Sequence, residues 1–308
     1  MLEVRSLTKT FGAQRAVDDL SFTVHPGTVT GFLGPNGAGK STTLRAAVGL
    51  LRPDRGEVLL GGRRYADLRA PLREVGALLD ARAVHPRRRA REHLAVLAAT
   101  HGIPRSRVDE VLGLVGLIDV AKRRPGGFSL GMAQRLGIAT ALLGDPGILL
   151  LDEPVNGLDP EGVRWVRQLL RGLAAEGRTV FLSSHLMSEM AVTADRVVVL
   201  GRGRLVADVP LEDLTSAGRP TVRVRTPQSE RLRALLPGGS VTADPADPRA
   251  LVVTDATPEQ LADLAARHAI PVHELTPVRT SLEDAYLELT RHDVEYAVTT
   301  VPEGSAVR

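Results

Sequence analysis

The sequence predicts an α/β protein core followed by a smaller α+β domain, and three observations support this prediction. Short apolar runs alternate with segments of helical periodicity over most of residues 1–217. A glycine-rich turn separates one of these runs from the helical segment that follows it. After residue 218 the pattern restarts, with prolines between its pieces. The 308 residues suffice for about two domains, each with its own core.

The first domain, residues 1–217, is expected to contain short buried strands and the helices that connect them. The strands are expected at residues 2–4, 20–24, 28–33, 148–151 and 179–182, and the helices at residues 40 to about 50 and 160–175. The run at 148–151 is apolar throughout, which is typical of a parallel strand covered on both faces. A hairpin is expected around Gly201-Arg202-Gly203.

A helical subdomain is expected within this domain, at about residues 81–145, because apolar residues at 92–100 and 108–115 recur at helical spacing. The second domain, residues 218–290, is expected to be a small accessory or regulatory domain. Its strands and helices are expected at residues 221–225, 229–236, 240–243, 250–254, 258–268, 271–275 and 281–290. Residues 291–308 lack periodicity and are expected to form a flexible tail.

Composition excludes several classes of protein. Apolar residues make up 43% and charged residues 24% of the chain, which is ordinary for a globular protein. There is no cysteine, so disulfide scaffolds, thiolate metal sites and thiol nucleophiles are excluded. The net charge is only +3, although 36 arginines accompany three lysines, and aromatic residues make up 3%. A nucleic-acid partner is therefore not expected.

The segment Gly34-Pro35-Asn36-Gly37-Ala38-Gly39-Lys40-Ser41 matches the P-loop pattern, between an apolar strand and a helix. Glycines allow successive backbone N–H groups to curl around phosphate oxygens at a helix N-terminus. Lys40 then meets the β- and γ-phosphates of ATP, and the Ser41 hydroxyl ligates Mg²⁺. The predicted nucleotide-binding residues of this loop are Gly34, Pro35, Asn36, Gly37, Ala38, Gly39, Lys40, Ser41 and Thr42. The alternative is a glycine turn with an exposed lysine.

Two carboxylates, Asp152 and Glu153, directly follow the apolar run at 148–151. A parallel strand delivers such side chains to the edge of the sheet where phosphates bind. We expect Asp152 to hold Mg²⁺ through water and Glu153 to polarise the water that attacks the γ-phosphate. Alone, this pair would more often be a plain strand end. Together with Lys40 it predicts an ATPase.

A further segment, Phe128-Ser129-Leu130-Gly131-Met132-Ala133-Gln134-Arg135, resembles the signature of the ATP-binding subunits of ABC transporters, and the resemblance covers about residues 2–214. Leu130 and Met132 stand where the family usually has Gly and Gln. Ser129 can cap a helix whose positive end faces outward. The resemblance implies that Ser129, Gly131 and Gln134 are presented to ATP held by a second subunit. An ordinary capped core helix is the alternative.

Three further positions resemble the family. Asn156-Gly157-Leu158-Asp159 resembles the loop through which the two subunits communicate, which adds Asp159 to the expected nucleotide-contacting residues. His185, after the strand at 179–182, resembles the histidine that contacts the γ-phosphate, so the expected catalytic residues are Glu153, His185 and Lys40. Phe11 resembles the aromatic residue that stacks on adenine, with a plain core side chain as the alternative.

One position departs from the family. Asp80 stands where a glutamine usually reaches Mg²⁺ and the attacking water. An aspartate can ligate the metal, so the candidate metal-binding residues are Ser41, Asp152 and Asp80, but its shorter, charged side chain puts the coupling geometry in doubt. The basic residues at 87–91 are interpreted as a solvated face. In the family they lie near the groove that receives a helix of the membrane partner, where they could instead steer docking.

The resemblance implies an ATP-hydrolysing subunit that powers a separate integral membrane permease. Its working unit would be a head-to-tail homodimer at the cytoplasmic face of the membrane, which it touches through the permease. The signature at residues 129–132, the variant at residues 155–157 and the appended C-terminal domain together most resemble daunorubicin- and bacitracin-type exporters, which implies export of a drug or another amphiphile. The alternative is a soluble ABC-type ATPase acting on nucleic acid or ribosomes. Such relatives usually show paired cassettes, coiled coils or cysteine zinc sites, which this sequence lacks.

Overall fold

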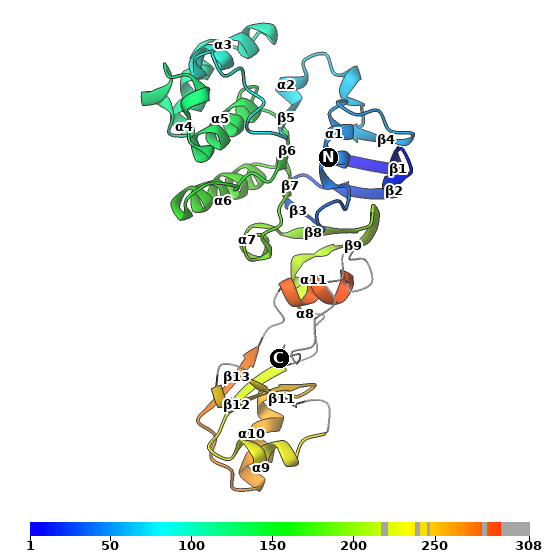
Figure 1. Ribbon diagram of the computed structural model, residues 1–308, viewed down its shortest axis with the longest axis vertical. Coiled ribbons are helices and arrows are strands. Elements are labelled where there is room, and N and C mark those ends of the chain that lie inside the picture. Colours follow the sequence, from blue (N-terminus) through cyan, green and yellow to red (C-terminus); the bar gives the residue numbers. More distant parts are fainter. Residues whose placement is uncertain (217–220, 238–240, 245–246, 279–281, 291–308) are drawn as a thin grey trace, which may run out of the picture. The chain divides into compact units, whose positions relative to one another are not determined.

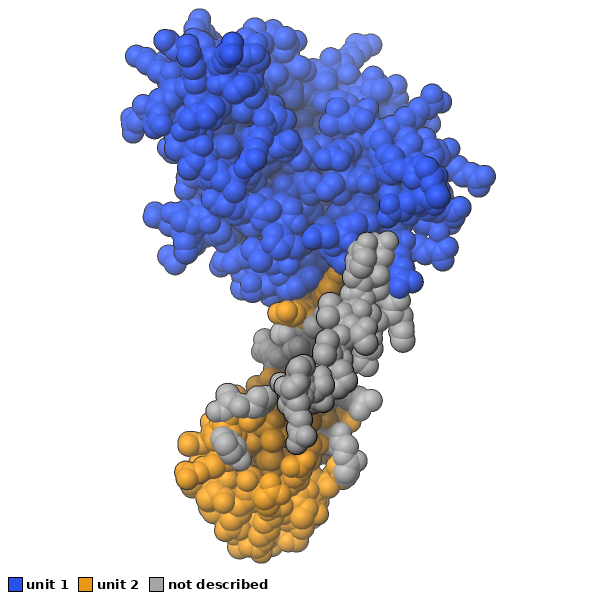
Figure 2. All heavy atoms as spheres, viewed as in Figure 1, with its two compact units in different colours: residues 1–209, 289–308 blue, residues 210–288 orange. Residues whose placement is uncertain are grey.

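The computed structural model describes residues 1–216, 221–237, 241–244, 247–278 and 282–290. The chain divides into unit 1, residues 1–209 and 289–308, and unit 2, residues 210–288 (Figure 2). The domain boundary expected after residue 217 and the tail expected at 291–308 lie outside the described residues.

Unit 1 contains two β-sheets. The antiparallel sheet has the order β2-β1-β4, with β1 at Leu2–Phe11, β2 at Gln14–Val24 and β4 at Arg55–Leu60. The second sheet has the order β5-β6-β7-β3-β8-β9, with β5 at Val75–Leu78, β6 at Ile148–Asp152, β7 at Thr179–Ser183, β3 at Val29–Leu33, β8 at Arg196–Gly201 and β9 at Arg204–Pro210. Its strands from β5 to β8 run parallel, so their carboxyl ends share one edge. This edge is where a phosphate site is expected.

Helices cover these sheets. Those of unit 1 are α1 (Lys40–Ala47), α2 (Pro71–Glu74), α3 (Ala90–Thr100), α4 (Ser106–Leu114), α5 (Leu130–Leu142), α6 (Pro160–Ala175) and α7 (Met187–Thr193), with 3₁₀ turns at Tyr65–Asp67, Ile118–Val120 and Pro125–Gly127. Helices α3, α4 and α5 gather at one end of the unit, away from the β1–β2–β4 sheet (Figure 1). They lie between β5 and β6 in the chain, within the segment that the sequence predicts to be helical.

The two sheets share an apolar core. Phe22 of β2, Phe32 of β3 and Phe181 of β7 pack together with ring centroids 4.8 to 5.6 Å apart. Every residue of β3 and of β7 is buried, as expected for strands covered on both faces. This fixed core holds the carboxyl ends of β3, β6 and β7 in place around the site described below.

The structure differs from the sequence prediction mainly in the antiparallel sheet. Strands β1 and β2 extend beyond their short apolar runs, because their outer halves, which mix buried, half-buried and exposed residues, still pair as far as Phe11 with Gln14. The sequence analysis missed β4, whose polar start at Arg55 conceals its apolar end, and also β5, α2, α7 and α8. Helix α1 ends at Ala47 instead of about Leu50, since Gly49 adopts a left-handed backbone with φ of 71°.

Unit 2 has the element order of a split βαβ fold. Its elements are α8 (Leu211–Ser216), β10 (Thr221–Arg225), α9 (Ser229–Ala234), β11 (Val241–Asp244), β12 (Asp247–Thr254), α10 (Pro258–Arg267), β13 (Glu274–Val278) and most of α11 (Leu282–Thr290), whose last two residues fall in unit 1. The sheet has the antiparallel order β11-β12-β10-β13, and its apolar face packs with Leu232 of α9 and Leu261 of α10. The strand predicted at 271–275 begins later, because Glu274 is the residue that pairs with Arg225.

None of the described helices has the length and apolar character needed to cross a bilayer.

Candidate functional site

The glycine-rich loop joins the end of β3 to the first residue of α1. Gly39 has a left-handed backbone with φ of 102°, and a side chain there would begin 2.4 Å from the carbonyl oxygen of Ala16. Only glycine therefore fits at this position without a shift of the backbone. The loop in turn places the N-terminus of α1, with its free N–H groups, at the carboxyl edge of the parallel sheet.

Lys40 crosses the loop that precedes it. Its Nζ donates hydrogen bonds to the carbonyl oxygens of Gly34 at 2.5 Å and Pro35 at 3.1 Å, and the residue is only 8% exposed. Burial lowers the pKa of Lys40, while the nearby carboxylates of Glu153 and Asp152 act in the opposite direction. An ammonium group desolvated in this way gains strongly from an anionic ligand such as a phosphate.

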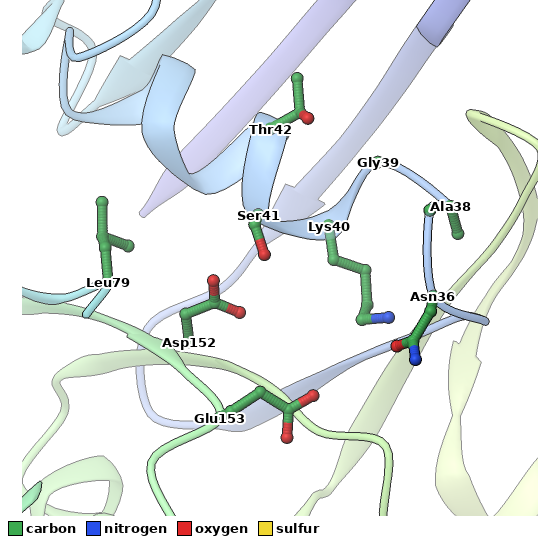
Figure 3. A pocket seen from close by; sticks show the side chains of 10 residues that line it. Asn36, Ala38, Gly39, Lys40, Ser41, Thr42, Leu79, Asp152 and Glu153 are labelled. Carbon is green, nitrogen blue, oxygen red and sulfur yellow. The ribbon is translucent and has the colours of Figure 1, made fainter. Parts of the chain in front are cut away.

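These groups line a pocket of about 350 Å³ (Figure 3). Its lining residues are Asn36, Gly37, Ala38, Gly39, Lys40, Ser41, Thr42, Leu79, Asp152 and Glu153. The Ser41 hydroxyl and the Asp152 carboxylate point toward one another, and Lys40 extends toward the space between Asn36 and Glu153 (Figure 3). Two motifs more than 100 residues apart in the sequence thus meet in one cavity.

Neighbouring side chains orient the two carboxylates. The Ser183 hydroxyl, at the end of β7, donates to Oδ1 of Asp152 at 2.5 Å and accepts a hydrogen bond from the backbone N–H of Glu153 at 3.0 Å. Nδ1 of His185 lies 2.8 Å from Oε2 of Glu153. Of the expected catalytic residues, Lys40 and Glu153 line the pocket, whereas His185 does not line it and reaches it through its contact with Glu153. Sequence analysis missed Ser183, whose only signal is its place two residues before His185.

The donor set of this pocket suits Mg²⁺. A serine hydroxyl and a carboxylate are hard oxygen ligands, which Mg²⁺ prefers, and phosphates and water complete its coordination in nucleotide sites. Ser41 and Asp152 face one another across the cavity, so both could contact one ion (Figure 3).

Asp80, the third candidate metal ligand, is not among the residues that line this pocket. It lies after β5, where its Oδ1 accepts a hydrogen bond from the backbone N–H of Arg82 at 2.8 Å. It lines a separate cavity of about 490 Å³, together with Tyr65 of a 3₁₀ turn and His93 of α3. Its neighbour Leu79 reaches the phosphate pocket.

Other predicted nucleotide contacts lie elsewhere in the chain. Phe11, at the end of β1, is 50% exposed, and the Lys9 ammonium lies 5.6 Å from its ring centre. A plain core side chain is therefore excluded for Phe11. Ser129 caps α5 by accepting a hydrogen bond from Met132, and Gly131 follows in the first turn. Neither lines the phosphate pocket of its own chain.

Two further candidates use their side chains within the protein. Gln134 is 4% exposed, and its Nε2 donates to the carbonyl oxygen of Glu153 at 2.9 Å. Asp159 caps α6 by accepting a hydrogen bond from Gly162 at 3.0 Å. Here both side chains orient the backbone around the site. Direct contact of Gln134 or Asp159 with nucleotide stays a prediction.

Comparison with known proteins identifies the family. A family model described as ABC transporter matches residues 17–156, and a second, described as a domain of unknown function (DUF8746), matches residues 220–283. YhcH of Bacillus subtilis (strain 168), described as an uncharacterized ABC transporter ATP-binding protein, is 35% identical over 303 residues, which span 96% of this chain and 99% of YhcH. The chain belongs to the ABC transporter ATP-binding proteins.

Two more similarities place the chain within the ABC family. It is 41% identical to the bacitracin transport ATP-binding protein BcrA of Bacillus licheniformis, over 71% of this chain and 72% of BcrA. A dimeric structure of the ATP-binding cassette MJ0796, in a post-hydrolysis state bound to ADP and Pi, aligns with a TM-score of 0.63 and 26% identity, over 68% of this chain and 99% of the cassette. The chain is therefore an ABC-type ATPase subunit, and the predicted fold is confirmed.

Proposed function

We propose that two copies of this chain form a head-to-tail pair that hydrolyses ATP in the presence of Mg²⁺ and drives export of a drug or another amphiphile through a separate permease. The observation that carries the proposal is the pocket where Lys40 and Ser41 meet Asp152 and Glu153. The similarity to a bacitracin transport protein supports the class of cargo. The pair would act at the cytoplasmic face of the membrane.

The residues of the pocket divide the chemistry between them. The loop N–H groups and Lys40 bind the phosphates and stabilise the charge that spreads over them as the γ-phosphate leaves. Ser41 and Asp152 would hold Mg²⁺, which neutralises phosphate charge when it is bound. Glu153, oriented by His185 and by Ser183, accepts a proton from the attacking water.

The signature residues support the head-to-tail pairing. Ser129 and Gly131 begin α5, yet neither lines the phosphate pocket of its own chain. A two-fold pair would place the N-terminus of α5 from one copy opposite the phosphates bound by the other. Each chain holds one P-loop and one signature, so such a pair contains two complete sites.

A cavity of about 490 Å³ supplies a docking place for the permease. Its walls carry apolar side chains such as Leu50 and Val84, with Arg45 and Asp80 among them. Leu50 is 72% exposed. Arg87, Arg88 and Arg89 lie between Val84 and α3 in the chain, and Arg91 lies in the first turn of α3. These side chains are placed to steer acidic groups toward this cavity.

Reconstitution tests the proposed function. Affinity-tagged chain should co-purify with an integral membrane partner, and the complex in sealed vesicles should move bacitracin when Mg-ATP is supplied on the side of the tagged chain. The same vesicles containing Lys40→Met serve as the control. ATP turnover without movement of any amphiphilic cargo would contradict the exporter assignment while leaving the ATPase assignment intact.

Replacement of Asp80 by alanine is expected to reduce transport at least about fivefold, while the isolated subunit keeps most of its ATPase activity. The reason is that Asp80 lines the cavity proposed for the permease and does not line the phosphate pocket. Transport and basal phosphate release are measured in parallel, with Asp119→Ala as the exposed carboxylate control. A large loss of basal turnover would show that Asp80 serves the metal or the water.

Unit 2 is proposed to hold the assembly together between turnovers. One face of its sheet packs against α9 and α10, while alternation places Arg223 and Arg225 on the other face. Arg223 pairs there with Asp244 and Glu274 at 2.7 Å, and both carboxylates raise the pKa of the Arg223 guanidinium. A charged face of this kind is suited to a polar interface.

Deletion of all residues after 217 is expected to leave a fragment that folds and binds Mg-ATP, because the phosphate pocket lies entirely in unit 1. The fragment should lose either the expected nucleotide-free dimerisation or the binding of the permease. Light scattering of the nucleotide-free fragment and a pull-down with the permease measure the two associations. Unchanged results in both would rule out an assembly role for unit 2.

A further inference from the structure

The backbone of Glu153 adopts a conformation that few residues other than glycine adopt. Its φ is +50°, in the left-handed region, where the side chain of an L-residue crowds the backbone. Such a conformation persists when neighbouring groups hold it on several sides. The Glu153 backbone N–H donates to the Ser183 hydroxyl, and its carbonyl oxygen accepts from the N–H of Asn156 at 3.2 Å. This backbone conformation sets the direction in which the Glu153 side chain projects from the end of β6.

A further group holding Glu153 comes from the signature helix. Nε2 of Gln134 donates to the Glu153 carbonyl oxygen at 2.9 Å, and the Gln134 side chain is almost completely buried. Gln134 lies five residues after Ser129, about 7.5 Å along the axis of α5. The same helix therefore carries the cap Ser129 at its outward end and a donor to the catalytic segment one turn later.

Packing at the start of α5 connects the helix to the same segment. A side chain at Gly157, where φ is +74°, would begin 2.3 Å from Cδ2 of Leu130. A side chain at Gly131 would begin 3.0 Å from the carbonyl oxygen of Gly157. Leu130 thus fills space that glycine leaves open at 157, and the first turn of α5 cannot shift toward this loop without a clash. Two separate contacts therefore join α5 to residues 153–157.

We infer that Gln134 is a positioning residue that sets the Glu153 carboxylate from the signature helix, and so links the two ATP sites of the pair. The inference rests on the proposed function, in which Ser129 acts on ATP bound by the second copy. Movement of α5 when the partner's ATP arrives is transmitted through the Gln134 amide to the backbone of Glu153. Occupancy of one site then adjusts the general base of the other.

Two substitutions of Gln134 separate positioning from packing. Gln134→Met keeps a similar length but cannot donate, so kcat should fall about tenfold, while the dissociation constant for Mg-ATP should change by less than about twofold. The Hill coefficient for ATP should fall toward 1, because the link between sites is lost. Steady-state phosphate release and nucleotide titration of the full-length chain measure these quantities.

The kcat of Gln134→Glu should recover at low pH. An ionised carboxylate cannot donate to the Glu153 carbonyl oxygen, whereas a protonated carboxyl can. The ratio of its kcat to that of the wild type should therefore rise as the pH falls, while the same ratio for Gln134→Met stays flat. A merely structural role would give no such difference. The two variants are independent tests, so poor folding of one, judged by its melting curve, leaves the other decisive.

Thr140→Val is the matched control. It also removes a hydrogen bond on α5, from the Thr140 hydroxyl to the Leu136 carbonyl oxygen at 2.9 Å, but this bond stays within the helix. Its kcat should remain within about twofold of the wild type. A wild-type kcat in folded Gln134→Met, with the unmodified chain fully active, would overturn this inference alone. An unmodified chain without ATPase activity would instead overturn the proposed function.

Discussion

Replacement of Glu153 by glutamine is expected to lower the rate of ATP hydrolysis at least about 100-fold while leaving ATP affinity nearly unchanged. The amide keeps the size and shape of the carboxylate, and Lys40 and Ser41 remain in place to bind the nucleotide. It is, however, a far poorer acceptor for the proton of the attacking water. Phosphate release gives the rate, and equilibrium titration with a fluorescent ATP analogue gives the affinity.

Glu161→Gln is the control for this substitution. Glu161 lies in the first turn of α6, eight residues from Glu153, and is exposed. The Glu161→Gln variant should retain the wild-type rate of ATP hydrolysis. If Glu153→Gln hydrolyses ATP as fast as the unmodified chain, Glu153 is not the general base, and another group orients the attacking water.

Lys40→Met should weaken the binding of Mg-ATP about 100-fold, through the loss of charge-assisted hydrogen bonds to two phosphates. The ammonium is largely desolvated and already directed by the loop carbonyls of Gly34 and Pro35, so little reorganisation accompanies phosphate binding. Isothermal titration calorimetry measures the affinity, and a melting curve verifies that the variant folds.

Lys122→Met removes an exposed ammonium from the same unit and should bind Mg-ATP like the unmodified chain. An unchanged affinity for Lys40→Met would mean that the loop N–H groups and the metal bind the phosphates without the lysine. That result would contradict the assignment of Lys40 as a phosphate-binding residue.

Local signals explain why some elements were predicted accurately. Helix α6 spans residues 160–175 as expected, because Asp159 caps it, Pro160 starts it and its apolar face is well separated from its polar face. Strand β10 also has its expected bounds, since the buried side chains of Val222 and Val224 alternate with half-buried residues. Strand β5 was missed, because four residues give too short a pattern to separate a strand from its neighbours.

The phosphate-binding part of the site was predictable from sequence because Lys40 and Ser41 are adjacent, and so are Asp152 and Glu153. Contacts between distant residues were not. Ser183 reaches Asp152 across 31 positions, and Gln134 reaches the Glu153 backbone across 19, so no local pattern identifies either bond. Asp80 illustrates the same limit of sequence analysis. Only the fold shows that Asp80 lines a neighbouring cavity and not the phosphate pocket that Ser41 lines.

The central claim is that each ATP site is shared between two copies of the chain. Mixing two inactive variants, Glu153→Gln and Ser129→Glu, tests it by measuring ATPase activity after the subunits have exchanged. In a mixed pair, one site contains both defects, and the other combines an intact Glu153 with an intact signature. The account predicts recovery of up to about a quarter of the wild-type rate, from the half of the pairs that are mixed. A mixture no more active than its two components would contradict it.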